Sequence, residues 1–174
     1  MSLSSVFIGG SLSIRELPKE VCQRLDRIIE QRLPVLIGDA PGADAAVQKY
    51  LNSKNFDHVR VFCSGRRPRN NIGGWPVESL KLDGQGFAFH SAKDRVMAIR
   101  TRYGFMIWDR KSQGTLLNVY RLTGYGKACV VWLQPEQRFL TIRSVERFKE
   151  FVSDALPADV WEQALQKERL ALYS

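Results

Sequence analysis

Short apolar segments alternate with stretches of helical spacing along the first part of the chain. The segments at 5–8, 34–38 and 58–63 are brief and bounded by turn-forming residues, which is typical of buried strands. Between them, apolar residues recur at intervals of three and four over 17–34 and 43–51, which predicts amphipathic helices. This order predicts βαβ units with right-handed crossovers in a parallel sheet.

The regular pattern breaks after the third predicted strand. Residues 64–86 carry five glycines, two prolines and three arginines. Long excursions of this kind in compact domains are often functional, so we expect this one to cover a site. Ser91 and Asp94 fit a capping box with Asp in place of the usual Glu or Gln, which places the start of the next helix at Ser91.

Regular elements continue to the end of the chain. Apolar runs predict further strands over 105–108 and 128–133, with a helix over 115–122 between them. The remainder is predicted to be helical, with one apolar stripe before Pro157 and another after it.

These segments together predict the α/β class. We expect a three-layer Rossmann-like fold with a mostly parallel, doubly wound sheet of about five or more strands and helices on both faces. Residues 1–135 are expected to form this domain, and 136–174 a helical extension packed on it. No segment approaches the roughly 18–20 apolar residues that span a bilayer. The first residues lack the basic start of a secretory signal, so the expected location is cytoplasmic and without a membrane partner.

Charge narrows the choice of partners. Lys and Arg number 26 against 18 Asp and Glu, a formal net charge of +8, which favours anionic ligands. A phosphorylated small molecule is the first candidate and a nucleic acid the second, while a solvated basic face is the alternative. Three dispersed cysteines suit neither a disulfide framework nor paired metal-ligand spacing, and two histidines exclude a His-rich metal centre, so no metal is expected.

Three loops after predicted strands combine glycine with polar residues, at 9–11, 38–44 and 109–115. Ligands of open parallel sheets bind beyond the carboxyl ends of the strands. A glycine at a helix N-terminus lets a phosphate reach unpaired backbone N–H groups, and Ser112 and Thr115 add hydroxyl donors. The alternative is that the glycines only make turns. Neither a P-loop nor a dinucleotide fingerprint is present.

Several side chains near these loops are candidates for chemistry. Asp39 and Asp44 flank the second loop and suit a ribose hydroxyl, a backbone amide or general-base work, although Asp44 equally suits a helix N-terminus. His90 is expected to be structural. Trp75 is a candidate for stacking on a base, and Trp108 is expected in the core.

Five segments together resemble the SLOG superfamily, the Rossmann-like group of the Smf/DprA and LOG proteins, and within it the YspA/YpsA-related branch. The resemblance covers roughly residues 5 to 133. It implies a nucleotide or nucleotide-derived ligand of the NAD, ADP-ribose or nucleoside monophosphate type, no required cofactor, and the option of a homodimer. The segments are 6–11, 37–44, 69–71, 93–97 and 108–115. The site residues carried over are Gly9, Gly10, Ser11, Gly38, Asp39, Gly42, Ala43, Asp44, Arg69, Asn70, Lys93, Asp109, Lys111, Ser112, Gly114 and Thr115.

One departure bears on catalysis. The phosphoribohydrolases of this family end their phosphate loop in a glutamate implicated in catalysis, and Asn118 stands at that position here. An amide cannot act as general base or nucleophile. We therefore expect a sensor or binding module. The alternatives are an N-glycosidic or phosphate hydrolase, with Asp44 or Asp109 as the acid, and a single-stranded-DNA-associated protein like the DNA-processing branch.

Overall fold

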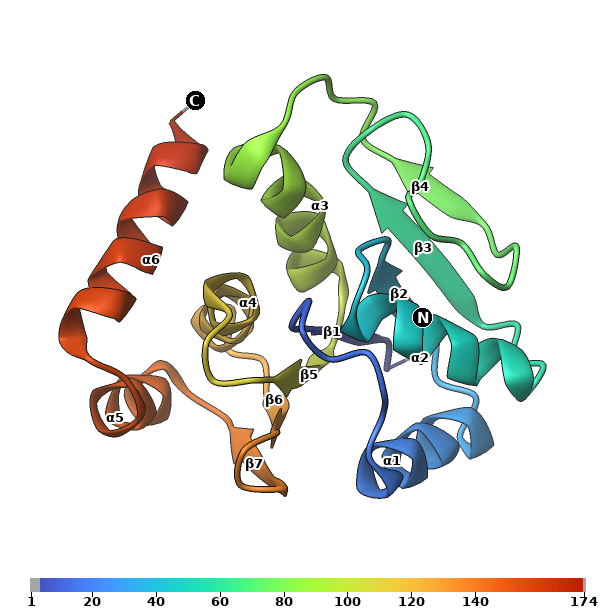
Figure 1. Cartoon of the computed structure of the whole chain (residues 1–174), viewed down its shortest axis with the longest axis horizontal. Coiled ribbons are helices and arrows are strands. Elements are labelled where there is room, and N and C mark those ends of the chain that lie inside the picture. Colours follow the sequence, from blue (N-terminus) through green and yellow to red (C-terminus); the bar gives the residue numbers. More distant parts are fainter. Residues whose placement is uncertain (1–3, 174) are drawn as a thin grey trace.

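The computed structural model describes residues 4–173 and, within them, a seven-stranded sheet with helices on both faces (Figure 1). The strands lie in the order β4-β3-β2-β1-β5-β6-β7, and all neighbours are parallel except β6 and β7. The Rossmann-like α/β fold is thus confirmed. The elements are β1 (Val6–Gly10), α1 (Lys19–Glu30), β2 (Val35–Gly38), α2 (Ala43–Ser53), β3 (Val59–Cys63), β4 (Val77–Ser79), α3 (Gly86–Arg100), β5 (Tyr103–Trp108), α4 (Gln113–Gly124), β6 (Cys129–Leu133), β7 (Arg138–Ile142), α5 (Val145–Ala155) and α6 (Ala158–Leu172).

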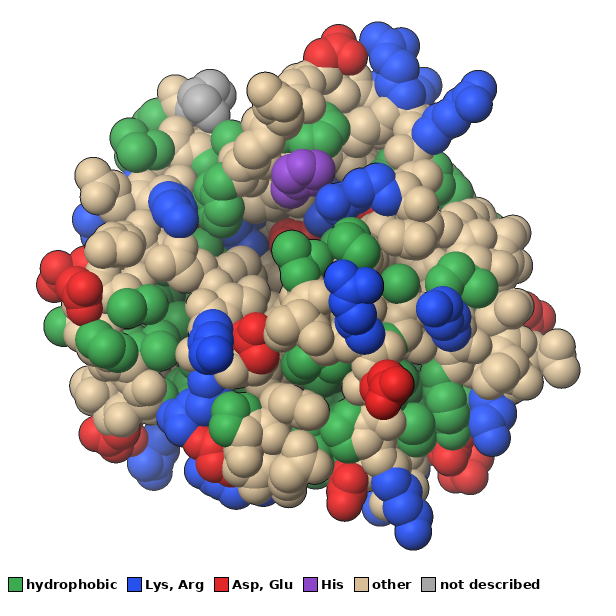
Figure 2. Space-filling view, viewed as in Figure 1, with side chains coloured by type: hydrophobic (Ala, Val, Ile, Leu, Met, Phe, Trp, Pro, Cys, Tyr) green, Lys and Arg blue, Asp and Glu red, His purple; other side chains and the backbone are tan. Residues whose placement is uncertain are grey.

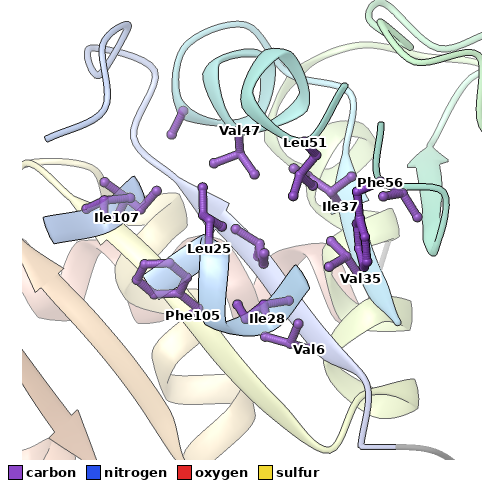
Figure 3. Packing of buried hydrophobic residues seen from close by; sticks show 14 of the residues in the cluster. Val6, Leu25, Ile28, Val35, Ile37, Val47, Leu51, Phe56, Phe105 and Ile107 are labelled. Atoms are coloured by element: carbon purple, nitrogen blue, oxygen red, sulfur yellow. The ribbon is translucent and has the colours of Figure 1, made fainter. Parts of the chain in front are cut away.

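Alternation along the central strands divides the core into two layers. In β1, Val6 and Ile8 pack toward α1 and α2, whereas Phe7 packs toward α3 and α4, because successive side chains of a strand point to opposite faces. Figure 3 shows the first layer, where Leu25 of α1 and Leu51 of α2 meet the strands. Both sheet faces are therefore covered, as a parallel sheet requires.

The C-terminal segment differs from its sequence-based prediction. Residues 138–142, expected to be helical, form β7, which pairs antiparallel with β6 at the edge of the sheet. After β7, α5 packs Phe148 and Val152 into the second core layer. The last helix, α6, packs on α3 and α4 rather than on the sheet (Figure 1). The expected extension therefore begins with a strand that completes the sheet.

The start of α3 was also placed wrongly by the capping-box interpretation. The helix begins at Gly86, and Ser91 lies inside it, where its hydroxyl donates to the carbonyl of Ala88. A serine inside a helix commonly bonds back to a preceding carbonyl in this way. Because Gly84 and Gly86 both have positive φ, the turn into the helix depends on glycine rather than on a capping side chain.

The excursion over 64–86 is tied to the domain rather than free. Trp75 is buried, its indole N–H donates to the carbonyl of Phe56, and the Asn71 side chain brackets its backbone through two hydrogen bonds. Trp75 is therefore unavailable for stacking on a base, and Trp108 is a core residue as expected. Among the described residues, no helix has both the length and the apolar character needed to cross a bilayer.

Candidate functional site

A cavity of about 380 Å³ opens at the carboxyl edge of the parallel strands. Glycines at the end of β1 and residues at the start of α4, which follows β5, line its floor. Strands β1 and β5 are neighbours whose helical connections leave in opposite directions, and such a switch point is where open α/β sheets bind ligands. In Figure 2 the surface is hollowed near the centre of the view, over the region between α3, α4 and β1.

The structure brings half of the predicted site residues to the wall of this cavity. Gly9, Gly10, Asp44, Arg69, Lys93, Ser112, Gly114 and Thr115 line it. The other eight are not part of the lining. Seven of them lie in or beside the same loops, and Lys111 is exposed to solvent: Ser11, Gly38, Asp39, Gly42, Ala43, Asn70, Asp109 and Lys111.

Packing within the protein accounts for three of the four glycines in the first two loops. A Cβ on Gly10 would lie 2.5 Å from the carbonyl oxygen of Ile107, and one on Gly38 would lie 2.6 Å from Oδ2 of Asp44. Gly42 has a φ of 81° and would meet the backbone of Leu12. Gly114 is different, because a Cβ there would meet nothing within 4 Å. Close approach to a ligand therefore remains a reason for glycine at Gly114 in particular.

The third loop is held by the carboxylate of Asp109. This side chain accepts hydrogen bonds from Ser13 Oγ at 2.7 Å and from the backbone N–H groups of Lys111 and Ser112 at 2.8 Å each. Burial opposes the charge, but these bonds outweigh it and lower the pKa of Asp109. Its own N–H donates to the buried Ser11 hydroxyl. Asp109 therefore positions the loop, and its lone pairs are engaged there.

The hydroxyls at the start of α4 face one another. Ser112 caps the helix by accepting from the N–H of Thr115, whose own hydroxyl lies 3.1 Å from Ser112 Oγ. The backbone N–H groups of this first turn carry the partial positive charge of a helix N-terminus. The start of α4 therefore brings two hydroxyl groups and a helix N-terminus to the wall of the cavity.

Asp39 anchors the excursion to the second loop. It accepts hydrogen bonds from the backbone N–H of Arg69 and from its guanidinium at 2.9 to 3.2 Å, while the Asn70 amide donates to the carbonyl of Asp39. Burial opposes ionisation of Asp39, but the Arg69 bonds prevail and lower its pKa. Asp39 thus fixes the Arg69 cation at the cavity instead of reaching a ligand itself.

A buried charge cluster lies at the side of the cavity formed by α2 and α3. Lys93, 4% exposed, donates to Asp94 Oδ1 at 3.2 Å and to the carbonyl of His90. Asp44 accepts from the N–H of Ala40. Burial, opposed by the charge of Lys93 and reinforced by that of Asp94, raises the pKa of Asp44 from 3.8 to about 7. Asp44 can therefore exchange a proton near neutral pH.

Several cavity residues were not among the predicted site residues, although the sequence analysis noted Asn118 at the position of the phosphoribohydrolase glutamate and expected His90 to be structural. Phe87, His90, Ser91 and Asp94 come from one side of α3, and Asn118 and Arg121 from one side of α4. A usable signal was present in α4, where Gly114, Asn118 and Arg121 interrupt an apolar helix at intervals of four and three. In α3, the predicted start at Ser91 left Phe87 and His90 outside the helix, so the side that they share with Ser91 and Asp94 was not recognised.

Comparisons of this chain with family models, curated proteins and solved structures found no match. The resemblance to the SLOG superfamily therefore rests on the quoted motifs and stays a prediction.

Proposed function

We propose that the cavity binds a phosphorylated nucleotide or nucleotide-derived ligand and that the protein acts as a binding or sensor module. The observation that carries this proposal is the pairing of an open glycine, Gly114, with hydroxyl and N–H donors at the start of α4, on the wall of a cavity at the sheet's switch point. A volume of about 380 Å³ lies within the usual range for small-molecule sites.

The charges around the cavity suit such a ligand. Arg69 and Lys93 lie on the wall and can accompany the α4 N-terminus in holding an anion. Asp44 and Asp94 supply acceptors at the same cavity, which suit ribose hydroxyls or the N–H groups of a base. These cations and acceptors favour a ligand whose phosphate lies toward α4 and whose sugar or base lies toward α3.

Thermal unfolding against matched ligands tests the proposal. AMP, ADP, NAD, ADP-ribose and ribose 5-phosphate are compared with adenosine, which lacks the phosphate. A ligand at a hundredfold excess over its Kd adds about 2.7 kcal/mol, or roughly 5–10 °C at this size. We expect a phosphorylated member to raise Tm and adenosine to have a much smaller effect. The proposal fails if no phosphorylated compound raises Tm.

A second candidate function is hydrolysis of the N-glycosidic bond of that ligand, with Asp44 as proton donor. It is favoured by the position of Asp44 on the cavity wall beside Lys93, together with a pKa of about 7. Asp109 is the weaker choice, because it holds the loop and is not part of the lining.

Product analysis separates binding from turnover. D44N should abolish release of free base while AMP still binds, and D154N, at an exposed position on α5, should change neither. Unchanged turnover in D44N would remove Asp44 from the reaction. A short single-stranded DNA in the same panel tests the nucleic-acid alternative, which the +8 charge favours and which requires binding that weakens steeply with salt.

A further inference from the structure

A buried carboxylate on the outermost helix reaches the inner helices of the domain. Glu168 of α6 is 5% exposed and receives both Arg95 of α3 and Arg121 of α4. Arg95 donates to Oε1 at 2.9 Å and to Oε2 at 3.1 Å, and Arg121 engages the same two oxygens. Burial opposes the charge of Glu168, but the two guanidinium groups prevail and lower its pKa. Glu168 is therefore an anion shared by two cations.

From this carboxylate a chain of hydrogen bonds leads to the cavity. Arg121 Nη1 donates to Asn118 Oδ1 at 2.6 Å, which turns the Asn118 amide so that Nδ2 donates to Asp94 Oδ2 at 3.3 Å. Asp94 Oδ1 in turn accepts from Lys93. The orientation of the Asn118 amide, and with it one bond to Asp94, thus depends on which way the Arg121 guanidinium is held.

Arg121 also forms part of the boundary between two cavities. It lines the candidate site and a second cavity of about 330 Å³ at α6, which Arg95 and Glu168 also border. Because Glu168 occupies its Nε and Nη2, Arg121 directs Nη1 toward Asn118. A guanidinium held at both ends of its fork has few other orientations.

We propose that Glu168 is a positioning residue of the candidate site, acting through Arg121 and Asn118 to fix Asp94 and Lys93 at the cavity. This inference rests on the proposed function, and it makes α6 a part of the site's support rather than an appendage. A carboxylate is required because a glutamine offers a single oxygen acceptor and turns an N–H₂ group toward one of the arginines.

A double-mutant cycle tests this route, with AMP as the probe in titration calorimetry. E168Q should weaken AMP binding about tenfold, whereas E162Q, which removes the same charge from an exposed position of α6, should stay within twofold. R95Q removes the other arginine and leaves Arg121 paired, so it should also stay close to wild type. E168Q combined with N118A should bind no more weakly than N118A alone, because both act on the same bond to Asp94.

Two outcomes overturn the inference. Additive losses in E168Q and N118A mean that Glu168 does not act through Asn118. An equal loss in R95Q and E168Q means that Glu168 only docks α6 on α3. If E168Q does not fold, E168D, which keeps the charge but shortens the reach, takes its place with the same expectations.

A measurement without ligand keeps this inference separate from the proposed function. The side-chain NH₂ signals of Asn118, identified by their loss in N118A, are followed by ¹⁵N–¹H NMR in the free protein. They should move in E168Q and remain in place in E162Q and R95Q. Failure of AMP and the other nucleotides to bind the wild type would count against the proposed function alone. Unmoved Asn118 signals in E168Q would overturn the positioning role.

Discussion

Replacing Gly114 with alanine tests whether glycine is needed at this position for the fold or for binding a ligand. The substitution adds one methyl group in the first turn of α4, where a Cβ would meet no atom within 4 Å. Gly114 does not have a positive φ, so alanine fits its backbone without strain. A compatible Gly→Ala change stabilises a protein by about 0.4–1 kcal/mol, because it restricts the unfolded chain. At this size we expect Tm to rise by roughly 1–4 °C.

Ligand affinity should change in the opposite direction. Gly114 lines the cavity, and under the proposed function the phosphate approaches the backbone N–H groups at the start of α4, so a methyl group at this position should hold the phosphate away from them. A hydrogen bond to a charged group contributes about 1.5–3 kcal/mol, so losing one weakens binding roughly tenfold to hundredfold. Titration calorimetry with the best ligand of the thermal panel measures this loss.

Gly124 offers a matched control at the other end of the same helix. A Cβ on Gly124 would also meet no atom within 4 Å, and its φ is not positive, but this glycine is exposed and lies outside the candidate site. G124A should therefore leave affinity unchanged. Wild-type affinity in G114A, or equal losses in G114A and G124A, would refute the assignment of the phosphate to the start of α4.

Three further predictions concern the residues around the cavity. Because the pKa of Asp44 is raised to about 7, the folded state keeps a proton that the unfolded state has already lost, so stability falls as pH rises from about 4 to about 7. D44N should remove up to about 4 kcal/mol of this fall in urea unfolding, and parallel pH profiles for the two proteins would contradict the burial argument. G38A places a Cβ 2.6 Å from Asp44 Oδ2 and 3.1 Å from Lys93 Cε, so it should destabilise the fold by about 1–3 kcal/mol. An unchanged urea midpoint would show that these two side chains move aside at little cost. W75F leaves the Phe56 carbonyl without its indole donor and should cost about 1–3 kcal/mol, with faster proteolysis within 64–86; cleavage at the wild-type rate would mean that Trp75 does not anchor the excursion.

The central strands could be predicted from the sequence because each one is a short apolar run that can be recognised without knowing its neighbours in the sheet. The run Val6-Phe7-Ile8 and its counterparts are buried on both faces, so they read as apolar segments whatever their partners are. β7 was missed because it is an edge strand, partly exposed and paired on one side, and its structure depends on β6. The start of α3 was missed because positive-φ glycines, not a capping side chain, turn the chain into it.

For the candidate site, the order of strands and loops along the chain was enough to predict which loops meet, since strand ends in a parallel sheet lie at one edge. It could not determine which side chains face the cavity and which support it. Asp44 and Asp109 both belong to loops that were predicted to follow strands, yet burial beside Asp94 raises the pKa of Asp44, while three hydrogen-bond donors lower the pKa of Asp109. Arg121 and Glu168 are separated by 47 residues, and only the packing of α6 on α4 brings them together. Electrostatics depends on distance and burial in space, so these properties belong to the tertiary structure.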